Sequence, residues 1–135
     1  MPSIAVDAGP LVALFKGADN HHDRAVAFLQ GVGHPLVTNL VVISEVTALL
    51  APPFQTDFLE WATGALEIDR ETSADLPRIV EVMRKYADLP ADFADASLLA
   101  LCERLAITMI ATLDHHFDVY RTTRRRHLRN VFFST

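Results

Sequence analysis

Five acidic residues lie inside or just after apolar stretches of the chain, where an ordinary core would place apolar side chains. They are Asp7, Glu45, Asp92, Asp95 and Asp114. A buried carboxylate without a partner costs several kcal/mol, so acids at such positions need compensation. No Lys or Arg is embedded in the stretches 4–15, 40–50, 90–99 or 107–120. A bound cation is therefore the simplest explanation of the set.

The chemistry that such a set supports is hard-cation binding. Mg²⁺ and Mn²⁺ take oxygen ligands, keep several waters and need only a few carboxylates. A bound ion of this kind activates water and stabilises charge on a phosphoryl group. The acids therefore predict a metal site for phosphodiester cleavage.

Each acid alone has a plainer interpretation. Asp7 alone would be a capping or loop residue at a strand end. Glu45 alone could face solvent, since it shares the polar side of its segment with Ser44 and Thr47. Asp95 alone could be a first-turn acid favoured by the helix dipole. The functional interpretation depends on the set and on its order along the chain.

The elements that must position these acids follow from apolar periodicity and turn signals. Expected strands cover 3–7, 36–38, 66–68, 108–112 and 130–133, and expected helices cover 9–17, 20–30, 40–50, 54–64, 74–87 and 91–105, with a short turn or helix at 114–120. Expected helix caps are Asn20, Thr38 or Asn39, and Thr72 or Ser73, while Pro52 and Pro53 stop the third helix. The helix 74–87 is expected to bury Leu76, Ile79, Val80, Val82, Met83 and Tyr86.

Short apolar strands that alternate with helices predict a three-layer α/β/α fold with a mainly parallel sheet of about five strands. In such a sheet, an acid at the end of a strand lies at the edge where ligands bind. We find no internal repeat and no linker, so we expect a single domain over residues 1–135.

Composition narrows the class of protein further. Half of the 135 residues are apolar, which is typical of a globular chain. Cys102 is the only cysteine, so no internal disulfide forms and a reducing cytoplasm is expected. The sequence has no signal peptide pattern and no apolar stretch of membrane-spanning length. We therefore expect a cytoplasmic protein that does not associate with a membrane.

The acids and their neighbours resemble a known family. Val6-Asp7, Ser44-Glu45-Val46, the segment 92–98 (DFADASL) and the segment 110–117 (IATLDHHF) are similar to the motifs of PIN domains, and more closely to those of VapC-type toxins. The resemblance covers essentially the whole chain. It implies a PIN-like fold and an endoribonuclease that cleaves RNA with a metal-activated water, leaving a 5′-phosphate and a 3′-hydroxyl.

The resemblance also implies roles for individual residues. The four metal-binding and catalytic acids would be Asp7, Glu45, Asp95 and Asp114, holding Mg²⁺ or Mn²⁺. Extra or supporting groups would be Asp92, Thr112 and Ser44. One departure is Gly9, because many members have Ser or Thr two residues after the first Asp.

Basic residues could guide RNA toward this acidic site despite the net charge of −5. Candidates for weak phosphate contacts are Arg121, Arg124, Arg125 and Arg126. A solvated basic loop, or a contact to a partner subunit, explains the same arginines equally well. The tandem pairs His21-His22 and His115-His116 lack the i, i+4 spacing of helical ligands, and we interpret them as surface residues.

The resemblance implies a cognate antitoxin protein and a homodimer, as in a type II toxin–antitoxin system. Two other functions remain open. A phosphotransfer receiver domain shares the size and an acidic pocket, but it would need paired acids after the first strand and a late Lys, and residues 107–120 contain no Lys. A non-catalytic PIN-like binding domain would keep the fold without cleaving RNA.

Overall fold

Five short strands form one sheet in which every pair of neighbours is parallel. Along the chain they are β1 (Ile4–Val6), β2 (Leu36–Asn39), β3 (Glu67–Asp69), β4 (Met109–Ala111) and β5 (Arg129–Asn130), arranged in the order β3-β2-β1-β4-β5. The computed structural model describes residues 2–122 and 125–133. The sheet order differs from the 2-1-3-4-5 order of flavodoxin-like receiver folds, which counts against the receiver interpretation.

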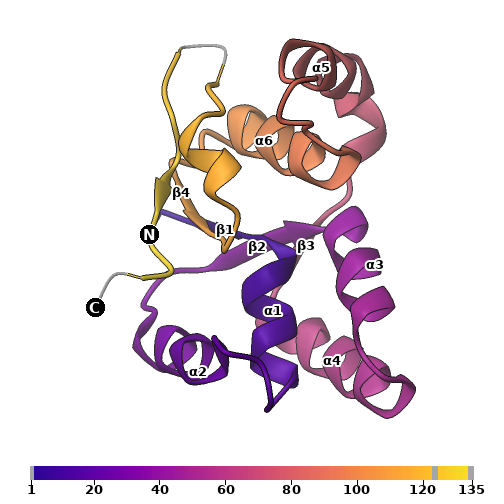
Figure 1. Cartoon of the computed structure of the whole chain (residues 1–135), viewed down its shortest axis with the longest axis vertical. Coiled ribbons are helices and arrows are strands. Elements are labelled where there is room, and N and C mark those ends of the chain that lie inside the picture. Colours follow the sequence, from indigo (N-terminus) through magenta and orange to yellow (C-terminus); the bar gives the residue numbers. More distant parts are fainter. Residues whose placement is uncertain (1, 123–124, 134–135) are drawn as a thin grey trace.

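Helices cover both faces of this sheet. They are α1 (Ala8–Phe15), α2 (His22–Gly31), α3 (Leu40–Leu49), α4 (Pro52–Ala65), α5 (Thr72–Lys85) and α6 (Phe93–Leu105), followed by the short 3₁₀ helix η1 (His115–Asp118). Figure 1 shows α5 and α6 on one side of the sheet and α1, α2 and α4 on the other. Helix α3 contacts both α1 and α6, so it connects the two layers. The predicted three-layer α/β/α fold is confirmed.

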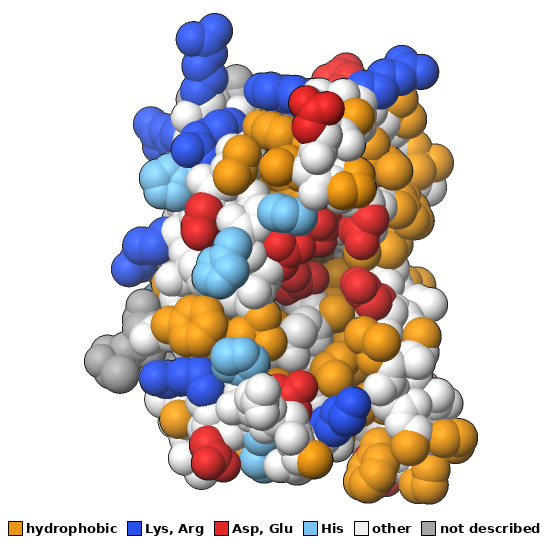
Figure 2. Space-filling view, in the orientation of Figure 1, with side chains coloured by type: hydrophobic (Ala, Val, Ile, Leu, Met, Phe, Trp, Pro, Cys, Tyr) orange, Lys and Arg blue, Asp and Glu red, His pale blue; other side chains and the backbone are white. Residues whose placement is uncertain are grey.

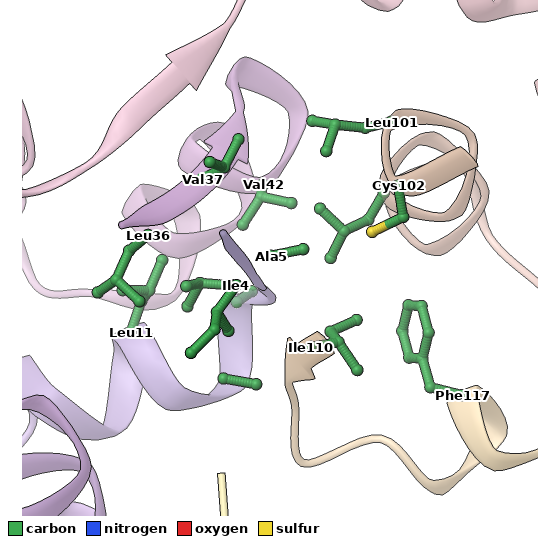
Figure 3. Packing of buried hydrophobic residues seen from close by; sticks show 14 of the residues in the cluster. Ile4, Ala5, Leu11, Leu36, Val37, Val42, Leu101, Cys102, Ile110 and Phe117 are labelled. Atoms are coloured by element: carbon green, nitrogen blue, oxygen red, sulfur yellow. The ribbon is translucent and has the colours of Figure 1, made fainter. Parts of the chain in front are cut away.

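The core is built around β1, whose three residues are all buried. Successive side chains of a strand point to opposite faces of the sheet. In Figure 3, Ile4 lies on the side of Leu11 from α1, and Ala5 lies on the side of Leu101 and Cys102 from α6. One apolar strand thus contributes to both layers of the core, which fixes the position of the residue that follows it.

Most predicted elements are present, and their ends show where local signals misled. Asn39 caps α3, since its Oδ1 accepts a hydrogen bond from the backbone nitrogen of Val42 at 3.0 Å. Asn20 does not cap α2: the helix starts at His22, and its cap position is His21. Neither Thr72 nor Ser73 caps α5, because both lie inside that helix. Pro52 and Pro53 open α4 as well as ending α3, because proline needs no amide hydrogen at a helix start.

Helix α5 buries less of its apolar face than the pattern predicted. Ile79 and Val82 are buried, but Leu76, Val80 and Met83 are exposed. Periodicity identifies an apolar face without saying whether another element covers it.

Among the described residues, no helix is long and apolar enough to cross a membrane.

Candidate metal centre

The two central strands place Asp7 and Thr112 side by side. Val6 is in register with Ala111, and the backbone nitrogen of Asp7 donates to the carbonyl of Ala111 at 3.0 Å. The Thr112 hydroxyl donates to Oδ2 of Asp7 at 2.8 Å, and the backbone nitrogen of Ala8 donates to Oδ1 of Asp7 at 2.8 Å. Asp7 is therefore both the N-cap of α1 and a buried acid at the carboxyl edge of the sheet.

The Thr112 hydroxyl also connects Asp7 to Asp114. It accepts a hydrogen bond from the backbone nitrogen of Asp114 at 2.9 Å while donating to Asp7. The side chain of Asn130 brackets the Thr112 backbone, donating to its carbonyl at 3.0 Å and accepting from its amide at 3.3 Å. Strands β4 and β5 together thus hold the hydroxyl that joins two of the acids.

Helix α6 contributes the third acid, and its start corrects one detail of the sequence interpretation. Asp92 is not inside the helix but is its N-cap, with Oδ1 accepting from the backbone nitrogen of Asp95 at 2.8 Å. Asp92 is exposed and Asp95 is buried, with 8% of its surface accessible. Oδ2 of Asp95 accepts a hydrogen bond from the hydroxyl of Tyr120 at 3.0 Å.

Helix α3 carries the fourth acid, Glu45, which is half-buried. The helix is tied to α6 by a buried hydrogen bond from the Asn39 amide to the Ser97 hydroxyl at 3.1 Å. The Ser97 hydroxyl in turn donates to the carbonyl of Ala94 at 2.7 Å. Asn39, which the sequence indicated only as a helix cap, and Ser97 therefore link the helices that bear Glu45 and Asp95.

The acids act on one another electrostatically, which shows that they form one cluster. Burial raises the pKa of Asp7 despite hydrogen bonds that lower it, and the charges of Asp114 and Asp92 raise it further. Burial and the charges of Asp92 and Asp7 raise the pKa of Asp95 to about 8. Burial, followed by Asp7, Asp92 and Asp114, raises the pKa of Glu45. In the space-filling view, acidic side chains gather in a hollow at the middle of one face (Figure 2).

This cluster fits a divalent cation. Every charged neighbour that shifts these pKa values is itself an acid, so the like charges are uncompensated by protein groups. Carboxylate oxygens are the ligands that Mg²⁺ and Mn²⁺ prefer. Side chains from four separate segments supply them, and a cation would remove the repulsion that now favours the protonated acids.

His116 is a further candidate ligand that the sequence interpretation missed. Ligand atoms of Asp95, Asp114 and His116 lie within 4.8 Å of one another, and the imidazole Nδ1 is 3.5 Å from Oδ1 of Asp114. The tandem His115-His116 spacing concealed this residue because η1 turns only one of the two toward the acids; the side chain of His115 is 90% exposed. The sequence signal that could have identified His116 as a ligand was its position two residues after Asp114, an acid that follows a strand.

The supporting groups and the departure at Gly9 have clear positions. The Thr112 hydroxyl contacts Asp7. Ser44 is exposed, and its carbonyl accepts a hydrogen bond from the Thr47 hydroxyl at 2.8 Å. A Cβ added at Gly9 would lie 3.0 Å from Cδ1 and 3.1 Å from Cβ of Leu113. A side chain at position 9 would therefore require Leu113, the residue before Asp114, to shift.

The structure describes three of the four arginines proposed to contact RNA. The guanidinium of Arg121 donates to the carbonyls of Asp118, Val119 and Tyr120 at 2.7–3.0 Å, which caps the end of η1. Arg125 and Arg126 are exposed. Arg124 lies outside the described residues.

Comparison with known proteins agrees with this fold. A sequence profile of the PIN domain matches residues 4–122. The structure of VapC20 from Mycobacterium tuberculosis, described as a sarcin–ricin loop cleaving toxin, is similar with a TM-score of 0.80 and 18% identity, covering 86% of this chain and 93% of that one. FitAcB from Neisseria gonorrhoeae is similar with a TM-score of 0.55 and 19% identity, covering 83% of this chain and 88% of that one. No curated protein sequence matches the chain.

The match extends from β1 to the segment after η1, and so it spans all four acids and Thr112. Together with the strand order and the acidic cluster at the carboxyl edge, it identifies the fold suggested by the motifs. The chain belongs to the PIN domain family.

Proposed function

We propose that the protein is a metal-dependent endoribonuclease and the toxin component of a type II toxin–antitoxin system. The observation that carries the proposal is the convergence of Asp7, Glu45, Asp95 and Asp114, which are far apart in sequence, into one acidic cluster. Burial and the charges of neighbouring acids raise the pKa of three of them, Asp7, Glu45 and Asp95. An enzyme that binds no cation would have little use for such a cluster.

The four acids would hold Mg²⁺ or Mn²⁺, with His116 within reach. Such an ion supplies an activated water and stabilises charge that develops on the phosphoryl group. The protein's own contribution is positioning: Thr112 orients Asp7 and the backbone of Asp114, and Asp92 fixes the first turn of α6 below Asp95. No side chain needs to act as a nucleophile.

RNA is the proposed substrate because the PIN family resemblance and the relative VapC20, a toxin that cleaves the sarcin–ricin loop, both point to it. Acids repel phosphates, so a basic rim must offset that repulsion. Arg125 and Arg126 are exposed and follow the acidic segment, and they are suited to phosphate contacts that carry no sequence information. Replacing both by Gln should weaken RNA binding and flatten its salt dependence, whereas Gln at the exposed Arg84 and Lys85 of α5 should not.

The proposed partners are a cognate antitoxin protein and a second copy of the chain, acting in the cytoplasm. An Arg side chain of the antitoxin would be suited to occlude this acidic pocket, because arginine forms bidentate contacts with carboxylates. Co-expression with the product of the neighbouring reading frame, followed by mass measurement of the complex, tests both partners.

The test of the activity is RNA cleavage by purified protein. We expect cleavage with Mn²⁺ or Mg²⁺, fragments that carry 5′-phosphates, and no cleavage in excess EDTA. Asp7→Asn and Asp95→Asn should each lower the rate to background. Asp118→Asn is the matched control, because Asp118 is an exposed acid on η1.

Two results would contradict the proposal. Equal cleavage in EDTA would exclude metal dependence, and full activity in the Asp7 and Asp95 variants would remove the acids from the site. Metal binding without any RNA cleavage would favour the alternative of a non-catalytic PIN-like binding domain.

A further inference from the structure

The carboxyl group of Asp95 accepts a hydrogen bond from the hydroxyl of Tyr120. Among the described residues, no other side chain outside the acid set forms a hydrogen bond with this carboxyl group. The Tyr120 hydroxyl lies 3.0 Å from Oδ2 of Asp95, and Tyr120 is only 1% exposed. This distance lies within the range of an O–H···O hydrogen bond. The bond occupies one oxygen of Asp95 and leaves the other for a cation.

Three aromatic rings pack against Tyr120. Phe117 lies edge-on at 5.0 Å between ring centroids, Tyr86 lies at 5.0 Å and His116 at 6.3 Å. The Tyr86 hydroxyl accepts a hydrogen bond at 2.9 Å from the backbone nitrogen of Arg121, the next residue after Tyr120. A side chain packed in this way has little rotamer freedom, so its hydroxyl points at a fixed location.

We propose that Tyr120 is a positioning residue that fixes the orientation of the Asp95 carboxylate for cation binding. The segment 114–120 then contributes twice to the site: Asp114 at its start as a ligand and Tyr120 at its end as the group that orients a second ligand on α6. The proposal rests on the metal site of the proposed function. Groups that orient metal ligands in this way are typically worth about 10–100-fold in metal affinity.

The chain provides its own matched control, because its two tyrosines are Tyr86 and Tyr120. Tyr120→Phe removes the hydroxyl that contacts Asp95, and Tyr86→Phe removes a neighbouring hydroxyl of the same aromatic cluster that contacts only backbone. We expect Tyr120→Phe to weaken Mn²⁺ binding, measured by titration, about 10-fold or more. Tyr86→Phe should stay within about 2-fold of wild type by the same reasoning.

A second measurement needs no destabilising variant. Replacing both tyrosines by 3-fluorotyrosine gives two ¹⁹F resonances, and the Tyr86→Phe variant assigns them. Added Mg²⁺ should shift the resonance of Tyr120 strongly and that of Tyr86 weakly. This arm decides the question if Tyr120→Phe does not fold.

Unchanged Mn²⁺ affinity in Tyr120→Phe, equal weakening in both variants, or a Tyr120 resonance that ignores Mg²⁺ would overturn the proposal. Wild-type protein that binds no Mn²⁺ would overturn it as well. Protein that binds Mn²⁺ with the expected dependence on Tyr120 but does not cleave RNA would support the positioning role while contradicting the proposed activity.

Discussion

Two groups of acids in this molecule are buried to a similar degree but treated in opposite ways. Asp69 at the end of β3 and Asp75 on α5 share the guanidinium of Arg104, at 2.6 Å and 2.9 Å. Asp7 and Asp95 at the carboxyl edge of the sheet have only acids as charged neighbours. Where buried acids tie β3, α5 and α6 together, the fold supplies an arginine, and at the sheet edge it supplies none. The contrast supports the proposal that the second group binds a cation.

Removing Arg104, the cation shared by Asp69 and Asp75, should have the largest effect on stability. Arg104→Met removes four hydrogen bonds and leaves Asp69 and Asp75 without their cation. Partial exposure of Arg104 reduces the loss, so we expect about 2–4 kcal/mol in the free energy of unfolding. Chemical denaturation measures it. The free energy of unfolding of Arg104→Lys should lie between those of Arg104→Met and wild type, since lysine keeps the charge without the bidentate geometry. A loss that Mg²⁺ restores would contradict the distinction between the two groups.

Neutralising an acid at the sheet edge should stabilise the metal-free protein instead of destabilising it. Asp95→Asn removes a like charge from a buried cluster and keeps an oxygen for the Tyr120 hydroxyl. Without metal at pH 8, the variant should therefore be more stable than wild type by about 1–2 kcal/mol. In saturating Mn²⁺ the order should reverse, because only wild type gains binding energy. Destabilisation of the metal-free protein, measured by denaturation in EDTA, would count against the account.

The pH dependence of the metal-free protein sharpens the same contrast. The pKa of Asp95 is raised to about 8 when folded, against about 3.9 when unfolded, so the folded state holds the proton more tightly. This contribution to stability is fully present below about pH 4 and is lost as the pH rises through about 8. The difference in Tm between Asp95→Asn and wild type should therefore grow from pH 5 to pH 8.5. A difference that stays constant would show that Asp95 is ionised throughout.

The smallest expected effect concerns the nitrogen ligand. His116→Ala should lower Mn²⁺ affinity more than Mg²⁺ affinity, because imidazole suits transition metals better than Mg²⁺. We expect a change of a few-fold, since His116 lies at the rim of the site and is 41% exposed. His115→Ala is the matched control. Equal losses for both ions would exclude His116 as a ligand.

Much of the site could be predicted from the sequence because the acids interrupt apolar stretches. Asp7 and Asp114 follow strands whose apolar residues are unmistakable, and in a parallel sheet both strand ends meet at one edge. Those inferences need only local pattern and one topological rule. The supporting role of Thr112 was implied by the resemblance to PIN domains, and the structure places Thr112 beside Asp7 because β1 and β4 are neighbours.

The remaining features depend on contacts between distant segments, which leave no local pattern. Tyr120 meets Asp95 across 25 positions, and Asn39 meets Ser97 across 58. Arg104 and Asp75 look like ordinary surface residues until α5 packs on α6. Asp92 could not be recognised as a cap because a Phe and an Ala follow it in what reads as a continuous helix.

The central claim is that the acids at the sheet edge form a cation site, and calorimetric titration of Mn²⁺ tests it most directly. We predict saturable binding to wild type at pH 8 and its loss in Asp7→Asn, while Asp118→Asn binds as wild type does. Absence of binding to wild type, or binding to Asp7→Asn with unchanged affinity, would contradict the claim.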